Sequence, residues 1–170
     1  KLKYPKGGEV ILPPLTWISD VASVIHHGFK PVFVDIEFDT LSMSTAKILE
    51  SITEHTIAIF ITHAQGFDGL TDELIDYLNS NDIELIEDVC ESHGANHNDQ
   101  LLGTFGFISN FSFFYAHHMS TIEGGMICTD DHDIYQWSRM LRSHGMVREG
   151  TNRELRESYE TQFPELNPDF

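Results

Sequence analysis

Short apolar runs rich in β-branched and aromatic residues alternate with segments of helical periodicity, and this alternation constrains the fold more than any other feature of the sequence. Runs such as IAIFI contain no polar residue, which is typical of strands covered on both faces. Strands that alternate with helices favour an α/β fold with a mostly parallel sheet. The predicted strands are 9–14, 30–36, 56–64, 83–89, 107–114 and 124–130, and the predicted helices are 16–28, 44–52, 72–80 and 131–145.

Local signals place the ends of several of these elements. Thr16 is expected to cap the first helix, and Gly28 is expected to stop it. The pattern changes from Gly94, and residues 96–106 have the composition of a turn or hairpin. Residues 157–170 are polar and proline-containing, and they predict no further element.

Charge and hydropathy exclude several classes of partner. The chain has 27 acidic against 10 basic residues and a formal net charge of -17, so its field repels nucleic acid and anionic lipid. No apolar run approaches the roughly 18 residues of a membrane-spanning helix, and the first residues do not resemble a signal peptide. We therefore expect a cytoplasmic protein, whose two cysteines, Cys90 and Cys128, are reduced and structural.

Residues whose side chains could bind a ligand or take part in catalysis follow the predicted strands. In an open α/β sheet, ligands bind at the carboxyl ends of the strands. There the sequence has Trp17, Asp88, Ser112 and His117. An aromatic face, a carboxylate, a hydroxyl and an imidazole would suit a flat, phosphorylated heterocycle with a protonated ring nitrogen. Residue types alone do not identify such a cofactor.

Five collinear motifs carry a family resemblance. The segments GGEVILPPLTWIS, GFKPVFVDIEFDTLSM, IELIEDVCESHGA, LLGTFGFISNFSFFYAHH and EGGMICTDD followed by LRSHG resemble the DegT/StrS family of pyridoxal-phosphate-dependent sugar enzymes. The match runs from about Gly8 to Arg148. It implies the three-layer large domain of a fold-type I enzyme, with a mostly parallel mixed sheet flanked by helices.

The resemblance also implies a domain organisation. Residues 1–170 would form the central part of the large domain, and an N-terminal segment and a C-terminal small domain would lie outside it. Alone, this part is expected to be inactive. The parent enzyme is expected to be a homodimer.

Four cofactor-binding roles follow from the resemblance. Trp17 matches the aromatic residue that stacks on the cofactor ring, and Asp88 matches the aspartate that pairs with the pyridine nitrogen. Ser112 matches a hydroxyl donor to the cofactor phosphate, and Glu91 stands where the aminotransferases often have glutamine. Without the resemblance, Trp17 would be expected in the core, and Asp88 and Ser112 would be local polar residues.

The resemblance assigns the central role to His117. It stands five residues after Ser112, where the aminotransferases have the lysine that forms a Schiff base with the cofactor. An imidazole cannot form a stable Schiff base, but it can transfer protons near neutral pH. The five lysines of the chain all lie in its first third; they are Lys1, Lys3, Lys6, Lys30 and Lys47.

These residues resemble the subgroup that removes the 3-hydroxyl of nucleotide-linked 4-keto-6-deoxy sugars for deoxysugar and lipopolysaccharide O-antigen biosynthesis. The implied cofactor is pyridoxamine phosphate or pyridoxal phosphate, the catalytic base is His117, and glutamate is the expected amino donor. Two cysteines are too few for an iron–sulfur cluster, so the cluster-free type is favoured.

Two other functions stay open. One is a nucleotide-sugar aminotransferase of the same family, which would need a reactive lysine. The other is a non-catalytic remnant that serves binding or regulation. A zinc site at His93 and His97 lacks a third ligand in the sequence, so no metal is expected.

Overall fold

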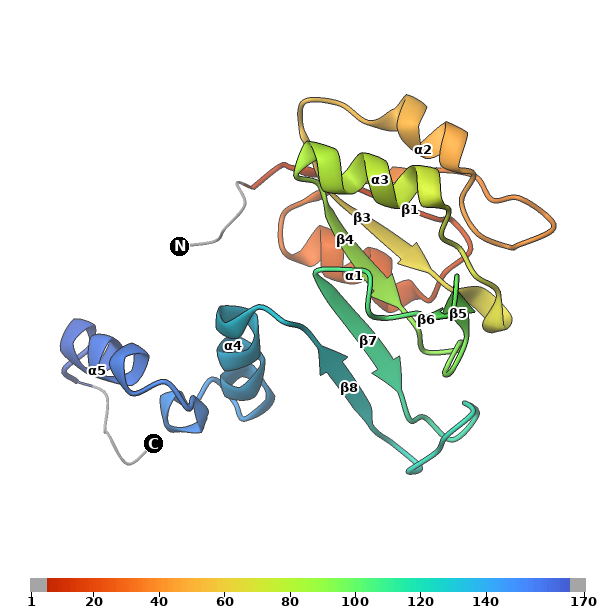
Figure 1. Cartoon of the computed structure of the whole chain (residues 1–170). Helices are drawn as coiled ribbons and strands as arrows, with labels where there is room; N and C mark the ends of the chain where they lie inside the picture. Colours follow the sequence, from red (N-terminus) through yellow and green to blue (C-terminus); the bar gives the residue numbers. More distant parts are fainter. Residues whose placement is uncertain (1–5, 166–170) are drawn as a thin grey trace. The chain divides into compact units, whose positions relative to one another are not determined.

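The computed structural model describes residues 6–165 (Figure 1), which form two compact units, one ending at Ile127 and the next beginning at Cys128. No helix within the described range is long and apolar enough to cross a membrane. The strands are β1 (Glu9–Leu12), β2 (Lys30–Phe33), β3 (Thr56–Thr62), β4 (Glu84–Asp88), β5 (Asn96–His97), β6 (Gln100–Leu101), β7 (Ile108–Ser112) and β8 (Gly125–Cys128). The helices are α1 (Ile18–His26), α2 (Thr45–Ser51), α3 (Asp72–Asn81), α4 (His132–Arg142) and α5 (Arg153–Gln162), with the 3₁₀ turns η1 (Ala64–Gly66) and η2 (Val147–Glu149).

The main sheet has six strands in the order β2-β1-β3-β4-β7-β8. Each neighbouring pair from β2 to β7 is parallel, whereas β8 runs opposite to β7 at one edge (Figure 1). Strands β5 and β6 form a separate antiparallel hairpin, as the turn-rich segment predicted. The mostly parallel mixed sheet predicted from the sequence is confirmed.

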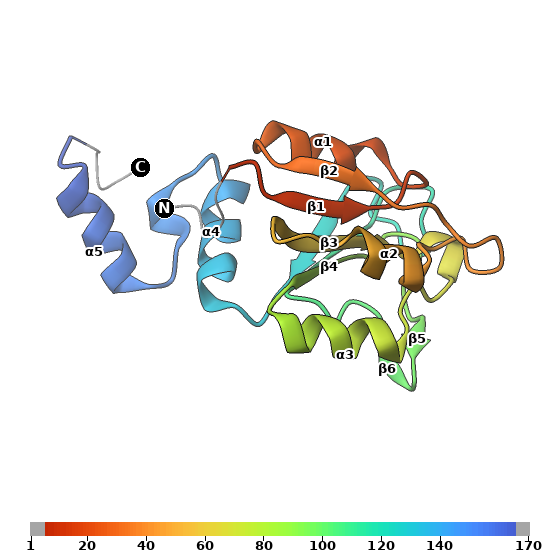
Figure 2. The same ribbon diagram turned by 90° about the horizontal axis from the view of Figure 1, so that it is seen from above.

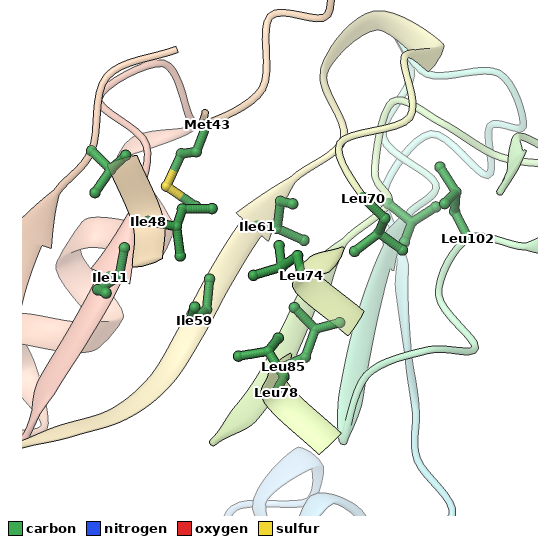
Figure 3. Close-up of a cluster of buried hydrophobic side chains, with 12 residues drawn as sticks. Ile11, Met43, Ile48, Ile59, Ile61, Leu70, Leu74, Leu78, Leu85 and Leu102 are labelled. Atoms are coloured by element: carbon green, nitrogen blue, oxygen red, sulfur yellow. The ribbon is translucent and has the colours of Figure 1, made fainter. Parts of the chain in front are cut away.

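Two apolar clusters on opposite faces of the sheet produce three layers (Figure 2). Along β3, Ile59 and Ile61 belong to the first cluster and Ala58 and Phe60 to the second, as the two-residue period of a strand requires. Helices α2 and α3 cover the first cluster, and α1 covers the second. The first cluster (Figure 3) comprises Ile11, Val34, Met43, Ile48, Ile59, Ile61, Leu70, Leu74, Leu78, Leu85, Val89 and Leu102. The second comprises Val10, Leu12, Val24, Ala58 and Phe60.

The register of the parallel strands aligns their carboxyl ends. Thr62 of β3 pairs with Asp88 of β4, and Asp88 pairs with Asn110 of β7. Because side chains alternate between the faces, all three lie on the face covered by α1. Their neighbours Glu87 and Ser109 point to the face covered by α3.

Two local predictions were wrong. Helix α1 begins at Ile18 with Trp17 as its N-cap residue, and Thr16 does not cap it because the Thr16 hydroxyl donates to the side chain of Asp20 instead. Helix α5 reaches Gln162, although the polar segment predicted no element there. The Asn152 side chain caps this helix by accepting a hydrogen bond from the backbone N–H of Leu155. Residues 166–170 of that prediction lie outside the described range.

The second unit has its own polar anchor. Gln136 of α4 is fully buried, and its side-chain oxygen accepts hydrogen bonds from the backbone N–H of Thr151 and Asn152. Its side-chain nitrogen donates to the Thr151 hydroxyl at 2.6 Å. These bonds join α4 to the start of α5.

Candidate active site

Loops after β3, β4 and β7 surround an open pocket of about 320 Å³. Two predicted site residues, Glu91 and His117, line it together. The remaining lining residues are Gln65, Ala116 and His118. The predicted catalytic residue and one predicted cofactor-binding residue therefore share a pocket at the carboxyl edge of the sheet.

The carboxylate of Glu91 is held by a residue that the sequence did not single out. Gln65 donates to Glu91 Oε2 from its backbone N–H at 3.2 Å and from its side-chain amide at 3.1 Å. Gln65 has a positive φ of 57°, a conformation uncommon for a residue other than glycine. The next residue, Gly66, donates its N–H to the Ser92 hydroxyl at 3.0 Å, which joins the two loops a second time.

His117 lies in the loop after β7 with a free ring nitrogen. Its backbone N–H donates to the carbonyl of Phe114 at 3.0 Å, and its ring packs edge-on against that of Phe114 at 5.8 Å between centroids. The Nδ1 atom of His117 is buried and has no hydrogen-bond partner among the described residues. Unpaired buried polar atoms are rare in folded proteins, so this nitrogen beside a pocket is a candidate partner for a ligand.

Asp88 ends β4 and is only 5% exposed. Its Oδ1 atom accepts hydrogen bonds from the backbone N–H of Cys90 at 2.9 Å and from the side-chain amide of Asn110 at 3.0 Å. Burial raises the pKa of the Cys90 thiol, and the adjacent Asp88 adds to the rise. Both Cys90 and Cys128 are half-buried, and that their thiols are reduced stays a prediction from the sequence.

A second acid stands beside Asp88. Asp20 of α1 is 6% exposed, and its carboxyl accepts a hydrogen bond from the Thr16 hydroxyl at 2.5 Å. The Thr16 hydroxyl is also 2.7 Å from that of Thr62 in β3. Burial raises the pKa of Asp20 to about 7, and the negative charge of Asp88 contributes to the rise. In the sequence, Asp20 is recognisable only as an acidic residue within an otherwise apolar helix, and the family motifs assign it no role.

Trp17 and Ser112 lie at the same edge of the sheet but do not line the pocket. Trp17 precedes α1 and is 74% exposed, so the alternative interpretation as a core residue is wrong. The half-buried Ser112 ends β7, and its hydroxyl accepts a hydrogen bond from the backbone N–H of Phe114 at 3.2 Å. A large aromatic surface and a hydroxyl are therefore available to a ligand.

His93 and His97 have separate surroundings. His97 Nδ1 is 2.6 Å from Asp68 Oδ2, and His97 Nε2 is 3.1 Å from Asp72 Oδ1. The ring of His93 instead packs near those of Phe111, Phe113 and His118. Within residues 6–165 no group of three or more His, Cys, Asp or Glu side chains has the arrangement of a metal site.

A family model described as the DegT/DnrJ/EryC1/StrS aminotransferase family matches residues 1–166. The chain belongs to this family. One DegT relative, GDP-4-keto-6-deoxy-D-mannose 3-dehydratase of Escherichia coli O55:H7, is 38% identical over 148 residues. That match covers 87% of this chain and 38% of the relative, so the chain spans less than two fifths of the enzyme's length.

Two solved structures of DegT enzymes resemble the chain closely. An E. coli GDP-4-keto-6-deoxy-D-mannose 3-dehydratase with bound hydrated PLP has a TM-score of 0.83 at 38% identity, covering 87% of this chain and 39% of that one. A GDP-4-keto-6-deoxymannose 3-dehydratase with a trapped PLP-glutamate geminal diamine has a TM-score of 0.82 at 35% identity, covering 91% and 42%. The predicted family and the fold-type I architecture are confirmed.

Proposed function

We propose that this chain provides the cofactor-binding core of a nucleotide-sugar 3-dehydratase that depends on pyridoxamine phosphate or pyridoxal phosphate and uses His117 as its base. The observation that carries the proposal is the position of His117. It follows β7, lines the pocket with Glu91, and has a buried ring nitrogen without a partner among the described residues. An imidazole so placed can transfer a proton but cannot anchor an aldehyde.

The described lysines lie away from this pocket. Lys30 begins β2, at the amino edge of the sheet, where its ammonium is 2.8 Å from Glu9 Oε1. Lys47 is in α2 and pairs with Asp35 at 3.9 Å. Lys6 lies beside Gly28, just before β2. Their positions favour a lysine-free site over an aminotransferase site.

The residues at the carboxyl edge fit the proposed cofactor. The buried carboxyls of Asp88 and Asp20 have no Lys, Arg or His in an ion pair with them anywhere in residues 6–165, and a protonated ring nitrogen would supply that positive charge. The indole of Trp17 offers a stacking face, and Ser112 offers a hydroxyl for the phosphate. Glu91 would hold a polar ring substituent. These four roles are proposals from the family motif.

When bound, the cofactor would supply an amine for the sugar ketone and a ring that accepts electrons. Asp88 would keep the ring nitrogen protonated. A ring nitrogen of His117 would accept the proton that is lost before the 3-hydroxyl leaves. Gln65 would keep Glu91 fixed during this step through its two hydrogen bonds.

The proposed substrate is a nucleotide-linked 4-keto-6-deoxy sugar, with glutamate as the amino donor. Support comes from relatives that are named for GDP-4-keto-6-deoxymannose and from one structure that holds a PLP-glutamate adduct. The homodimer, the cytoplasmic location and the absence of a metal stay predictions from the sequence.

Borohydride reduction tests the lysine-free site directly. We would incubate the full-length protein with pyridoxal phosphate, reduce it, and map the modified peptides by mass spectrometry. Reversible binding without a site-specific pyridoxyl-lysine is the expected result. A single modified lysine in the active protein would contradict the proposal and support an aminotransferase.

A His117→Asn variant tests the base. We expect it to bind pyridoxamine phosphate like the wild type and to lose about 10²-fold or more of the dehydration rate, since general bases contribute about that much. The matched control is His55→Asn, which makes the same change at an exposed residue and should retain the rate. Full activity of His117→Asn would exclude this role, and a full-length wild type without turnover would favour a non-catalytic protein.

A further inference from the structure

Two buried carboxyls meet on the face of the sheet that α1 covers. Asp20 is 6% exposed and Asp88 is 5% exposed, and burial together with the negative charge of Asp88 raises the pKa of Asp20. The family motif accounts for Asp88 but assigns nothing to Asp20. A second buried acid at this point therefore needs its own explanation.

Hydroxyl groups fix Asp20 in this position. The Thr16 hydroxyl donates to Asp20 Oδ2 at 2.5 Å and lies 2.7 Å from the hydroxyl of Thr62. Thr62 is the cross-strand neighbour of Asp88. The loop before α1 and the ends of β3 and β4 thus bring the two acids together.

The groups that face Asp20 within residues 6–165 are acidic or neutral. The acidic groups are Asp88, from β4, and the Cys90 thiol, from the loop after β4. Thr16, Thr62 and Asn110 add only neutral groups from the neighbouring loop and strands. Burial, with the charge of Asp88 added to it, disfavours the ionised form of Asp20, so Asp20 retains a proton into the neutral range.

We propose that Asp20 is a positioning residue for Asp88: it carries a proton beside Asp88 in the free site and releases that proton to solvent when the protonated ring nitrogen of the cofactor binds Asp88. The inference rests on the proposed function, because it requires that cofactor. The bound cation replaces the proton of Asp20 as the neighbour of Asp88. The positive charge of the cofactor ring then offsets the negative charge of Asp88 without a Lys, Arg or His of the protein.

The proton on Asp20 makes cofactor affinity depend on pH. In the free protein the pKa of Asp20 is about 7, and a cation on Asp88 lowers it. Binding therefore releases a proton in the neutral range, and by linkage the dissociation constant falls as the pH rises from 6 to 8. One titrating carboxyl accounts for a change of about fivefold to tenfold across this interval.

The test compares the wild type with Asp20→Asn in the full-length protein. Pyridoxamine phosphate is titrated by calorimetry at pH 6, 7 and 8, at each pH in two buffers with different ionisation heats. Asparagine keeps the shape and a hydrogen-bond donor but cannot titrate. The control is Asp76→Asn, the same change at an exposed residue of α3. The ligand titrates identically in all three proteins, so their differences isolate Asp20.

The expected result is an additional fivefold to tenfold pH dependence in the wild type and in Asp76→Asn, which Asp20→Asn lacks. At pH 7 the wild type should also release about half a proton more than Asp20→Asn. Equal pH slopes and equal proton release would overturn the role of Asp20 while leaving the proposed function intact. No binding of pyridoxamine phosphate to the wild type would overturn both proposals.

Discussion

Two consecutive acids of β4, Glu87 and Asp88, point to opposite faces of the sheet and have contrasting surroundings. Glu87 is fully buried and accepts hydrogen bonds from the backbone N–H of Gly103 at 2.7 Å, Phe105 at 2.9 Å and Gly106 at 2.6 Å. A side chain at position 106 would start 2.7 Å from the Leu85 carbonyl oxygen, so only glycine fits this close approach. Asp88 has two donors, both on one oxygen, and a second acid beside it.

His63 completes the surroundings of Glu87. The backbone N–H of Gly69 donates to His63 Nδ1 at 3.1 Å, so Nε2 carries the proton and donates to Glu87 Oε2 at 3.3 Å. Burial alone would raise the pKa of Glu87, but the bonds from His63, Gly103 and Gly106 outweigh burial and lower it. Hydrogen bonds from the fold surround Glu87, which holds a loop in place, whereas Asp88 has no cation partner within residues 6–165 and is the acid that we propose for the cofactor.

The largest effect on stability is expected on the Glu87 side. Glu87→Gln replaces an acceptor-only group by an amide that faces four N–H donors, three from the backbone and one from His63. We expect a loss of about 3–5 kcal/mol in the free energy of unfolding, measured by urea denaturation. Glu50→Gln, an exposed change in α2, should cost almost nothing. If both variants unfolded at the same urea concentration, the distinction between the two acids would be wrong.

A smaller effect, on binding rather than stability, is expected from Asp88→Asn. The variant loses a charge-assisted bond to the proposed cofactor, which contributes about 1.5–3 kcal/mol, so the dissociation constant of pyridoxamine phosphate should rise about 10- to 100-fold. Its urea midpoint should stay near that of the wild type, because the repulsion from Asp20 disappears together with the charge. A large loss of stability with unchanged cofactor affinity would reverse the roles assigned to the two acids.

A third effect is the pH dependence of stability from Asp20. Its folded-state pKa, about 7, exceeds its ordinary value of 3.8, so the folded protein keeps a proton that the unfolded chain releases between these values. The free energy of unfolding therefore falls as the pH rises from about 4 to about 7, by roughly 3 kcal/mol. In melting experiments without cofactor, Asp20→Asn should exceed the wild type in stability at pH 8 and match it near pH 4. A constant difference across this range would disprove the titration.

Most of the fold could be predicted because it depends on local patterns. The apolar runs identified all six strands of the main sheet, and helical periodicity identified α1 to α4. Strand ends were overestimated; residues 30–36 shorten to Lys30–Phe33, since pairing with β1 stops there and apolar composition does not. Helix α5 was missed because its stripe of apolar residues is weak, and only its cap at Asn152 signals its start.

The motifs could predict the residues of the candidate site, but the sequence could not predict the contacts between them. Order along the chain identified Trp17, Asp88, Glu91, Ser112 and His117, and the fold gathers all five at one edge of the sheet. The sequence did not predict Gln65 and Asp20 as site residues, because their contacts form only when separate loops come together in the fold. Gln65 donates to Glu91 from a separate loop, and Asp20 is linked through Thr16 to Thr62, the strand partner of Asp88; no local pattern encodes these contacts.

Because Glu87 and Asp88 point to opposite faces of the sheet, strand β4 should tolerate substitutions better than insertions or deletions. Deleting or inserting one residue before position 87 would exchange the two faces, and each acid would enter the environment of the other. The loop at residues 103–106 would lose its acceptor, while the carboxyl edge of the sheet would gain a longer acidic side chain on the face covered by α1. Genetic variation in β4 should therefore consist of substitutions, with length changes displaced into the loops on either side.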